Sequence, residues 1–254
     1  MDVNKFSLAG KRILVTGASS GIGRATAQLC SQLGASLICV GRDAGRLSQT
    51  LESLIGARHT IVLADVDDAD ELPRLLQSSV AASEPLSGVV HAAGVQRATP
   101  LRIAKAEDFL SQFRTNALSA AMIVSAVARR GVAHPDGCSV VLVGSVMSVV
   151  GAAGLAAYCT SKAAIAGLVR SAALELAAAK IRVNAVLPGM VDTEMSRRYR
   201  AAMAADQVRA IEQMHPLGLG EPTDVAHSIA FLLADAARWI TGSCLTVDGG
   251  YSAH

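Results

Sequence analysis

Aromatic residues, charge and pairable cysteines are all scarce in this chain of 254 residues. Aromatic side chains make up 3% and charged ones 17%, against 51% apolar residues, so the chain can bury a substantial core and is not disordered. The formal net charge is +2 and no basic run is present, which argues against a nucleic-acid partner. The length suits one large α/β domain or two small ones.

Five scattered cysteines form no Cys-x-x-Cys pair, and an odd number cannot all be bridged. Reduced thiols in a cytoplasmic protein are the simplest account. No set of residues has the spacing of metal ligands, so we expect no metal. The first ten residues lack the apolar centre of a signal peptide. Residues 137–161 carry no charge and are numerous enough for a membrane span, but serines and glycines break them, which favours a soluble protein.

Short apolar runs alternate with amphipathic stretches along the chain. The predicted strands are 11–16, 36–41, 59–64, 89–91, 139–144, 181–187 and 243–247. The predicted helices are 22–33, 44–54, 69–82, 107–130, 158–180 and 222–233, and 190–220 is expected to be less regular. An asparagine in mid-helix, as in 107–130, usually marks an exposed position. This alternation predicts a single α/β domain, a doubly wound parallel sheet with ligands beyond the carboxyl ends of its strands.

The first predicted strand runs directly into a turn that contains Gly17, Gly21 and Gly23. Glycines let the backbone turn sharply and approach a pyrophosphate, and the free N–H groups of the following helix attract its charge. The spacing Gly-x-x-x-Gly-x-Gly is wider than Gly-x-Gly-x-x-Gly, so the signal depends on its strand–turn–helix frame. The turn predicts a dinucleotide site.

The residues after the second strand bear on the choice between NAD and NADP. An acid there binds the ribose hydroxyls of NAD, whereas an arginine suits the 2′-phosphate of NADP. Gly41 stands where the acid is expected and Arg42 follows it, which favours NADP(H) and leaves NAD(H) possible. Asp43 is a ribose ligand or, as we prefer, the cap of the next helix. Asp65 and Val66, after the third strand, are expected at the adenine edge.

Tyr158 and Lys162 lie four residues apart in a predicted helix, so their side chains share one face. A free tyrosine has a pKa of ~10, and a positive charge about 4 Å away contributes ~4 kcal/mol at an effective dielectric of ~20. Lys162 is thus expected to lower the phenol pKa until it serves as proton donor and acceptor. Ser145 follows the preceding strand and can aim its hydroxyl at a substrate oxygen. The spacing alone equally fits a half-buried ring beside a solvated lysine.

Taken in order, these motifs resemble those of the short-chain dehydrogenase/reductase family in its compact one-domain form. The resemblance runs from about residue 7 to residue 251, and residues 188–193 and 247–250 match two later family motifs. The family's catalytic tetrad is matched by Asn116, Ser145, Tyr158 and Lys162. The resemblance implies a Rossmann-type enzyme that transfers a hydride between a nicotinamide cofactor and a carbonyl or secondary alcohol.

The resemblance also implies a role for each tetrad residue. Tyr158 is the expected acid/base, and Lys162 lowers its pKa and binds the nicotinamide ribose. Ser145 binds and polarises the substrate oxygen, an electrostatic role. Asn116 positions a water in a proton relay towards Lys162.

Cofactor contacts follow from the same resemblance, with the Thr193 hydroxyl and the Val191 backbone on the carboxamide. The expected contact residues are Gly17, Ser19, Ser20, Gly21, Ile22, Gly23, Arg42, Asp65, Val66, Ala93, Gly94, Tyr158, Lys162, Pro188, Gly189, Val191 and Thr193. One family motif departs, because the usual Asn-Asn-Ala-Gly begins here with His91. This residue either replaces one lost hydrogen bond or, as we prefer, is a satisfied core imidazole.

Three segments are expected to line the substrate pocket: 96–101, 147–155 and 190–215. The second is small and apolar, which suits an uncharged or partly apolar carbonyl. The third contains Arg197, Arg198, Arg200 and Arg209. These arginines either steer an anionic substrate such as an acyl-carrier thioester or, as we prefer, form the wet face of a helix. Residues 190–220 are predicted to close over the cofactor as a substrate lid.

Three functions stay open at this point. The first is a carbonyl/alcohol oxidoreductase of unassigned small-molecule substrate, and the second is a 3-oxoacyl-thioester (acyl-carrier-protein) reductase. The third is a non-catalytic NADP(H)-binding sensor, against which the complete tetrad argues. The helix from residue 158 carries the small residues Ala163, Ala164, Gly167, Ser171 and Ala172. In the family this helix packs on its copy, which implies a homodimer or homotetramer, although the pattern alone equally allows burial under a neighbouring helix.

Overall fold

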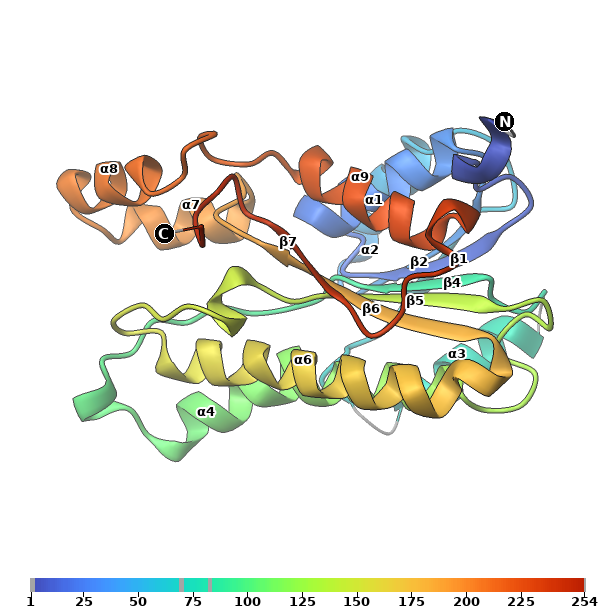
Figure 1. Cartoon of the computed structure of the whole chain (residues 1–254), viewed down its shortest axis with the longest axis horizontal. Coiled ribbons are helices and arrows are strands. Elements are labelled where there is room, and N and C mark those ends of the chain that lie inside the picture. Colours follow the sequence, from blue (N-terminus) through green and yellow to red (C-terminus); the bar gives the residue numbers. More distant parts are fainter. Residues whose placement is uncertain (1–2, 69–70, 82–83, 254) are drawn as a thin grey trace.

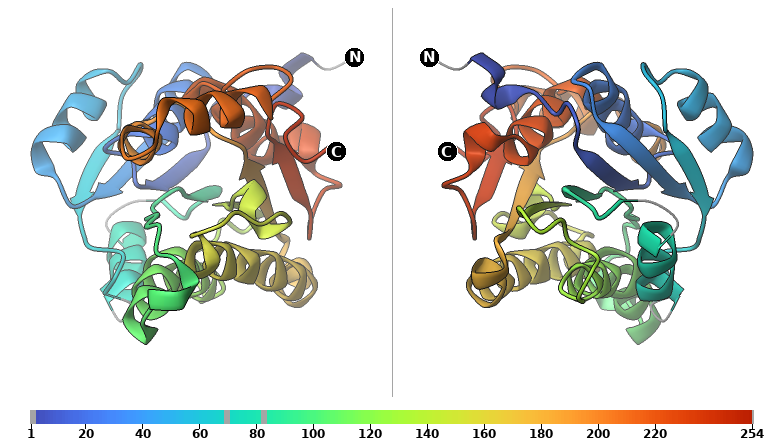
Figure 2. Two further views of the ribbon diagram at one scale, coloured as in Figure 1. Left: turned by 90° about the vertical axis from the view of Figure 1, so that its left-hand side faces the viewer. Right: turned by 90° about the vertical axis from the view of Figure 1, so that its right-hand side faces the viewer.

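The computed structural model describes residues 3–68, 71–81 and 84–253. Over these residues, seven strands form one parallel sheet in the order β3-β2-β1-β4-β5-β6-β7. Helices cover both faces of the sheet, as Figures 1 and 2 show. The doubly wound, Rossmann-type fold predicted from the alternating pattern is confirmed.

The strands and most helices begin and end close to their predicted positions. The strands are β1 (Arg12–Thr16), β2 (Ser36–Gly41), β3 (Thr60–Leu63), β4 (Gly88–His91), β5 (Cys138–Val143), β6 (Ile181–Pro188) and β7 (Cys244–Val247). The helices are α1 (Gly21–Gln32), α2 (Ala44–Glu52), α3 (Glu71–Ala81), α4 (Ala106–Phe113), α5 (Ser119–Val127), α6 (Ala156–Leu176), α7 (Glu194–Ala201), α8 (Ala205–Gln213) and α9 (Pro222–Leu233). The predicted ends of the third helix, 69 and 82, lie outside the described residues.

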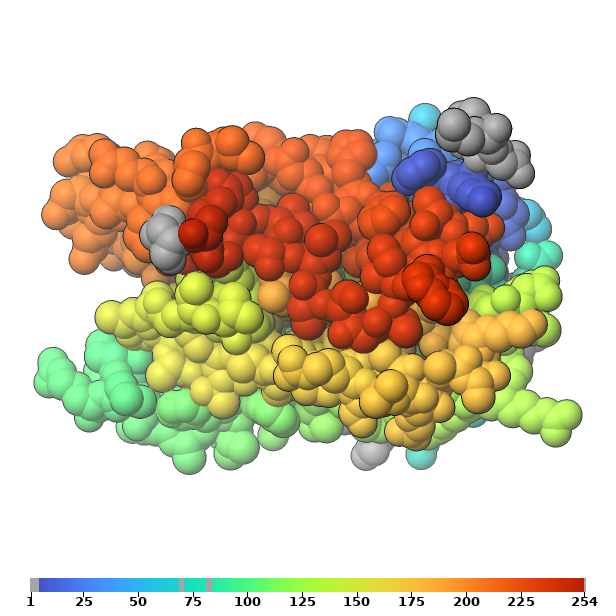
Figure 3. Space-filling model, viewed as in Figure 1, coloured from blue at the N-terminus to red at the C-terminus, as the bar shows by residue number. Residues whose placement is uncertain are grey.

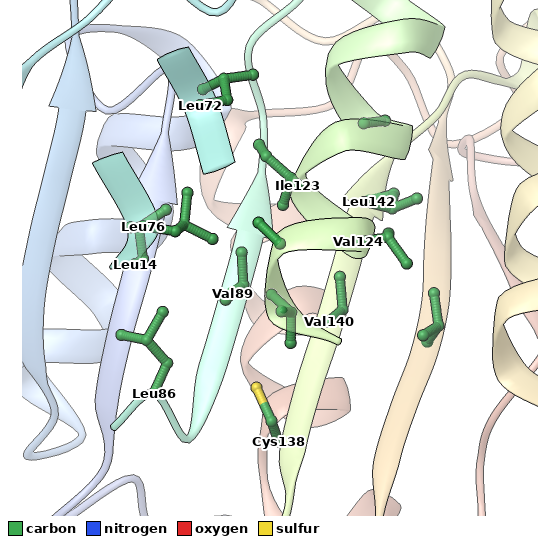
Figure 4. Packing of buried hydrophobic residues seen from close by; sticks show 14 of the residues in the cluster. Leu14, Leu72, Leu76, Leu86, Val89, Ile123, Val124, Cys138, Val140 and Leu142 are labelled. Carbon is green, nitrogen blue, oxygen red and sulfur yellow. The ribbon is translucent and has the colours of Figure 1, made fainter. Parts of the chain in front are cut away.

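Both faces of the sheet are buried beneath helices. On one face, Leu14, Val89 and Val140 pack against Leu76 of α3 and Ile123 of α5 (Figure 4). The alternate strand residues belong to a second core with α1, α2 and α9. Parallel strands that are buried on two sides appear in the sequence as continuous apolar runs. This is why the five strands between the edge strands β3 and β7 were visible as short apolar blocks.

The strand order reverses between β1 and β4. After β1 the chain moves outward through β2 and β3, and it then crosses to β4 on the other side of β1. In open α/β sheets the crevice at such a switch point, outside the carboxyl ends of the strands, binds ligands. The turns after β1 and β4 meet at this point.

The predicted helix over 107–130 is interrupted. α4 ends at Phe113, a π-helical turn spans Arg114–Leu118, and α5 ends at Val127. Asn116 lies within this turn and is 0% exposed, so the interpretation of a mid-helix asparagine as an exposed position is wrong here. The reason is that its amide bonds to a neighbouring loop, and π turns of this kind occur at functional sites.

The segment 190–220 is more regular than expected, because it contains α7 and α8. Its polar sequence has no broad apolar stripe, and hydrogen bonds at the helix starts hold it instead. Thr193 Oγ1 accepts from Ser196 N (3.2 Å), and Gln207 Oε1 accepts from Ala204 N (3.1 Å). Both helices lie at the carboxyl end of the sheet (Figure 1).

The uncharged stretch 137–161 is divided among several elements. It supplies all of β5, a 3₁₀ turn over Val146–Ser148 and the first turns of α6. Among the described residues, no helix combines the length and the apolar character needed to cross a bilayer.

Candidate active site

The turn after β1 is packed too closely to admit side chains. Gly17 has a φ of 67°, and a Cβ there would lie 2.7 Å from Ala93 N in the turn after β4. A Cβ on Gly23 would lie 2.3 Å from Gly17 O, so α1 begins directly against the turn. Arg24 Nη2 donates to Ser19 O (2.6 Å) and holds the loop in place. The resulting cradle at the start of α1 fits a pyrophosphate.

Charged residues line the end of the cleft beyond β2 and β3. Arg42 Nη1 lies 3.3 Å from Asp65 Oδ2, with 67% and 45% of the two side chains exposed. Asp43 caps α2, because its Oδ1 accepts from Arg46 N (3.0 Å). Arg46 Nη1 also lies 2.9 Å from Glu194 Oε2 at the start of α7. The preferred interpretation of Asp43 as a helix cap is therefore confirmed.

Tyr158, Lys162 and Ser145 approach one another from two elements. Tyr158 and Lys162 are buried in the first turns of α6, and Lys162 Nζ lies 6.0 Å from the centroid of the phenol ring. Lys162 Nζ donates to Val143 O at the end of β5 (2.8 Å). Ser145 Oγ accepts from Met147 N (3.2 Å), which leaves its hydroxyl hydrogen for another acceptor.

The pKa shifts of this group differ from the expectation. Burial raises the pKa of Tyr158 to about 12, and the hydrogen bond with Ser145 acts in the opposite direction. Burial lowers the pKa of the Lys162 ammonium to about 8. The expectation that Lys162 alone brings the phenol pKa towards neutrality is wrong for the protein without its cofactor, because removal from water has the largest effect on this pKa. The phenol is protonated at neutral pH.

Asn116 lies behind the cavity wall rather than on it. Its Oδ1 accepts from Val95 N (2.8 Å), and its Nδ2 donates to Val95 O (2.9 Å) and to Ser161 Oγ (2.9 Å). A Cβ on Gly94 would lie 3.1 Å from Asn116 Oδ1 and 3.4 Å from Lys162 Nζ. The side chain therefore fixes the loop after β4 against α6, directly beside the lysine.

His91 is the centre of a buried hydrogen-bond chain. Its Nδ1 lies 2.8 Å from Thr16 Oγ1, and its Nε2 lies 2.9 Å from Ser119 Oγ. Ser119 donates its own hydrogen to Thr115 O (2.6 Å), so it accepts from Nε2–H, and Thr16 donates to Nδ1. Burial lowers the pKa of His91 to about 3. The imidazole is thus satisfied, as preferred, and it also ties β4 to β1 and α5.

A cavity of about 650 Å³ connects the glycine cradle with Ser145, Tyr158 and Lys162. Its wall includes the predicted residues Gly17, Ser19, Ser20, Gly21, Ile22, Gly23, Arg42, Asp65, Val66, Ala93, Gly94, Ser145, Tyr158, Lys162, Pro188, Gly189, Val191 and Thr193. The predicted substrate segments contribute Gln96, Arg97, Met147, Ala152 and Leu155, together with side chains of α7 and α8. In Figure 3 the orange atoms of α7 and α8 lie above the yellow-green atoms of the loop before α6.

Sequence reasoning placed Tyr199 and His215 in a predicted lining segment without naming them, and it missed Tyr251, which also lies on this wall. His215 Nε2 accepts from Met190 N (3.0 Å) and its Nδ1 donates to Ile211 O (2.8 Å), so the ring fastens the segment after β6 to α8. The rings of His215 and Tyr251 are 4.7 Å apart. These positions share no sequence motif. The one available signal was that aromatic residues are scarce in this chain, so that the two tyrosines stand out.

Arginines of α7 are paired with nearby acids. Arg197 Nε lies 3.2 Å from Asp192 Oδ1, and Arg200 contacts the same carboxylate. Arg198 Nη2 lies 3.9 Å from Glu194 Oε2 and its side chain is 81% exposed. Their charge is largely balanced within their own segment, and Arg197 and Arg198 fit the preferred interpretation as a wet helix face, whereas the Arg200 side chain is only 19% exposed.

The cleft reaches from the glycine cradle to a phenol and an ammonium beyond β5, a span that suits a ligand as long as a dinucleotide. A dinucleotide beside a protonated phenol combines redox chemistry with proton transfer. The fold and cavity therefore define a dinucleotide-binding oxidoreductase.

Comparisons with known proteins agree with this class. A family model described as enoyl-(acyl carrier protein) reductase matches residues 17–252. Carbonyl reductase family member 4 of Danio rerio is 37% identical over 239 residues, which are 93% of this chain and 96% of the relative. The 3-oxoacyl-(acyl-carrier-protein) reductase of Mus musculus is 35% identical, with 93% and 95% covered. A crystal structure with bound NADP, of a candidate 2-deoxy-d-gluconate 3-dehydrogenase from Agrobacterium tumefaciens, is similar with a TM-score of 0.88 at 30% identity, with 99% and 100% covered.

The chain belongs to the short-chain dehydrogenase/reductase family, as its ordered motifs predict. It is an NAD(P)(H)-dependent oxidoreductase that transfers a hydride between a nicotinamide cofactor and a carbonyl or secondary alcohol. The family and activity implied by the sequence are thereby confirmed.

Proposed function

We propose that Tyr158 is the proton donor and acceptor of this reaction and that Ser145 and Lys162 act beside it. The observation that carries the proposal is the convergence of these three buried side chains on the cavity that also contains the glycine cradle. They are 9%, 8% and 4% exposed, respectively. Polar groups withdrawn from water in this way, with strongly shifted pKa values, are concentrated at functional sites.

Each of the three groups has a distinct task. A bound nicotinamide supplies or accepts the hydride. Ser145 holds the substrate oxygen with its hydroxyl hydrogen, which a substrate takes over from the phenol oxygen, since Met147 N–H occupies only a lone pair of the serine oxygen. Tyr158 gives that oxygen its proton during reduction, because a phenol with a pKa of about 12 is protonated at neutral pH and is a stronger acid than the alcohol product. Lys162 has two ammonium hydrogens left after its bond to Val143 O, for a ribose hydroxyl and for proton transfer.

The remaining tetrad residue, Asn116, acts mainly by position in this proposal. Its amide holds Val95 and Ser161, and it lies against Gly94 next to Lys162. It thereby sets the place at which a relay water meets the lysine. The cofactor itself is held by the residues named from the resemblance, with the Thr193 hydroxyl and the Val191 backbone on the carboxamide.

Replacement of the phenol tests the proposal. Tyr158→Phe should lower kcat by a factor of about 10³, in the range measured for general acid–base groups. The Kd for NADPH, measured by fluorescence titration, should stay within about twofold, because the ring and its packing are kept. Tyr199→Phe removes another phenol from the same wall and is the matched control, with an expected loss below about tenfold. A Tyr158→Phe enzyme with normal turnover would refute the assignment.

NADP(H) is proposed as the preferred cofactor. Arg42 follows β2 at the adenosine end of the cavity, and its present partner is an exposed acid at 3.3 Å. Exposed ion pairs of this kind contribute ~0–1 kcal/mol, so the guanidinium is available to a 2′-phosphate. The NADP bound to the Agrobacterium tumefaciens protein supports the same choice.

A 3-oxoacyl-thioester reductase is the second candidate function. The name of the Mus musculus relative and the description of the matching family favour it. The pairing of Arg197 and Arg200 with Asp192 weakens it, because these arginines are then less available to an acidic carrier protein. A carbonyl or alcohol of small size is therefore the first choice.

The segment 190–220 is proposed as the substrate lid. Its helices α7 and α8 contribute the cavity-wall residues Met195, Tyr199 and Ile211. Contacts that join it to the rest of the site include the Arg46–Glu194 ion pair and the hydrogen bond from Leu217 N to Gly249 O (3.1 Å). Closure over the ligand would exclude water from the proton-transfer site.

We further propose a homodimer or homotetramer in the cytoplasm. On α6, Ala163, Gly167 and Ser171 form an exposed stripe at intervals of four residues, while Ala172 is buried in the core. Leu174 on α6 is 85% exposed, and Phe113 on the adjacent α4 is 42% exposed. Such an apolar face with small residues suits a second copy of the helix pair. The five free cysteines support a reducing compartment.

A further inference from the structure

We infer that Arg97 binds an anionic group of the substrate. This group lies at the end of the substrate opposite the carbonyl or alcohol that reacts. The inference rests on the proposed function and names the class of substrate for the same site. Arg97 lies on the cavity wall in the loop after β4. Neither sequence motif nor resemblance had singled it out.

The backbone of Arg97 is held in a fixed position. Gln112 of α4 is 0% exposed, and its amide binds both backbone groups of the arginine: Oε1 accepts from Arg97 N (3.0 Å) and Nε2 donates to Arg97 O (3.3 Å). A buried glutamine that binds both backbone groups of an exposed residue keeps the base of that side chain at a defined place. The backbone from which the Arg97 guanidinium extends is therefore fixed.

This loop lies on the substrate side of the cavity. Thr99 N donates to Gly154 O (2.8 Å), which joins the Arg97 loop to the segment before α6. That segment contributes Ala152 and Leu155 to the wall and leads directly to Tyr158. The adenosine end, at Arg42, lies beyond β2, on the other side of β1 and β4.

The guanidinium of Arg97 has no partner among the described residues. Its side chain is exposed and takes part in no ion pair or hydrogen bond within the described part of the chain, whereas Arg42, Arg46 and Arg200 each contact an acid. An unpaired arginine on a cavity wall keeps its planar set of donors for a ligand.

Charge is distributed unevenly along the cavity. The acidic side chains on its described wall are Asp43, Asp65, Asp67 and Glu194. The three aspartates follow β2 and β3, and the glutamate is paired with Arg46 at 2.9 Å. The wall around Arg97 and Tyr158 thus combines a free cation with small and apolar side chains and, within the described residues, no carboxylate.

This combination fits a ketone or secondary alcohol with a carboxylate or phosphate at its far end. The small apolar wall accepts the carbon skeleton, Ser145 and Tyr158 take the reacting oxygen, and Arg97 binds the oxyanion. A carboxylate of a small oxo acid and a phosphate of a thioester cofactor share this chemistry. Matched pairs of charged and uncharged substrates distinguish the carboxylate from the phosphate.

Matched pairs of ketones test the inference in the NADPH-loaded wild-type enzyme. One set compares 4-oxocyclohexanecarboxylate and 4-oxopentanoate with their methyl esters. The other compares acetoacetyl-coenzyme A with the phosphate-free acetoacetyl-N-acetylcysteamine thioester. We expect kcat/KM to favour the anionic member of at least one pair by about tenfold or more, the size of a charge-assisted hydrogen bond. The pair that shows the preference identifies the source of the anion.

Substitution of the arginine completes the test. Arg97→Met should remove that preference, chiefly through a higher KM for the anionic member, and Arg97→Lys should restore part of it. Arg102→Met is the matched control, since Arg102 is exposed nearby on a 3₁₀ turn outside the cavity wall, and both members of each pair should react as in the wild type. Equal losses for acid and ester in Arg97→Met, or no preference in the wild type, would overturn the inference while the oxidoreductase assignment stands. An active Tyr158→Phe enzyme would instead refute the proposed mechanism.

Discussion

Two buried sets of polar groups lie near the carboxyl end of the sheet, and their hydrogen bonds are completed to different extents. His91 has a partner on each ring nitrogen, and the chain continues through Ser119 to a backbone carbonyl. Tyr158 and Lys162 are also buried, but the phenol hydrogen and two ammonium hydrogens are left over, because Ser145 donates to the phenol oxygen and Lys162 gives one hydrogen to Val143 O. Both groups have strongly shifted pKa values.

The difference teaches how to separate a structural polar group from a reactive one. Burial alone shifts the pKa of either, since desolvation opposes the charged form wherever it occurs. Unused hydrogen-bonding capacity that opens onto a cavity belongs to Tyr158 and Lys162 alone of this set. Substitutions in the His91 hydrogen-bond chain, which we call the closed chain, should therefore change stability. Substitutions in the Tyr158–Lys162 pair, which we call the open pair, should change turnover.

The largest expected effect on stability is at His91. His91→Leu leaves the Thr16 hydroxyl without its acceptor and removes the tie between β4 and α5. We expect the free energy of unfolding at pH 7, measured by urea denaturation, to fall by about 3 kcal/mol. Cofactor affinity of the folded fraction should stay within about threefold. A variant as stable as the wild type would show that the chain contributes nothing.

The same histidine makes the protein sensitive to acid. Its pKa is about 3 in the folded state against about 6.5 in the unfolded state, so between these values only the unfolded chain binds the proton. Stability is thus complete above pH 6.5 and falls as the pH approaches 3, by about 2–3 kcal/mol at pH 4.5. His91→Asn, the residue usual in the family, provides the control: its unfolding free energy should depend less on pH in this range.

Lys162 should show the opposite relation between stability and activity. Its folded pKa of about 8 lies below the unfolded value of about 10.5, so the cost of burying the charge is fully present below pH 8 and is relieved as the pH rises to 10.5. Lys162→Met should abolish turnover and yet raise the free energy of unfolding at pH 7 by about 2–3 kcal/mol. The gain should shrink by pH 10.

An exposed lysine gives the matched comparison for that variant. Lys105→Met alters a side chain at the surface before α4, and neither stability nor turnover should change appreciably. If Lys162→Met were less stable than the wild type at pH 7, its bond to Val143 would outweigh the burial of its charge. The contrast between the open pair and the closed chain would then fail.

The order of motifs was enough to predict the sheet and the main groups of the site. Short apolar blocks located every strand, and the five strands between β3 and β7 show the reason: a strand buried on both faces needs no alternation. The Tyr158 and Lys162 spacing placed both side chains at one cavity, because helix geometry turns an interval of four into a shared face. These predictions depend on local geometry, which a sequence encodes directly.

Predictions that needed burial or distant contacts did less well. The phenol pKa was expected to fall, but the spacing contains no information about desolvation, which raises it. The contacts of the Asn116 amide with Val95 and Ser161 were not predicted, because they depend on how the π turn meets two other elements. Likewise, His215 and Met190 are brought together by the fold of α8.

The smallest effect on stability is expected at Arg42, whose ion pair with Asp65 lies at the protein surface. The Arg42–Asp65 pair is neither buried nor closed, so it contributes little to stability and the arginine can exchange its partner. Arg42→Ala should leave the free energy of unfolding within ~0.5 kcal/mol and raise the Kd for NADPH about tenfold, but that for NADH less than about twofold. Arg74→Ala, at an exposed position of α3 outside the cavity wall, should change neither Kd. NADH lacks the 2′-phosphate, so loss of a contact to that phosphate cannot change its Kd. An equal rise in the Kd of both cofactors would therefore show that Arg42 supports the adenosine end as a whole, and it would remove the argument for NADP(H).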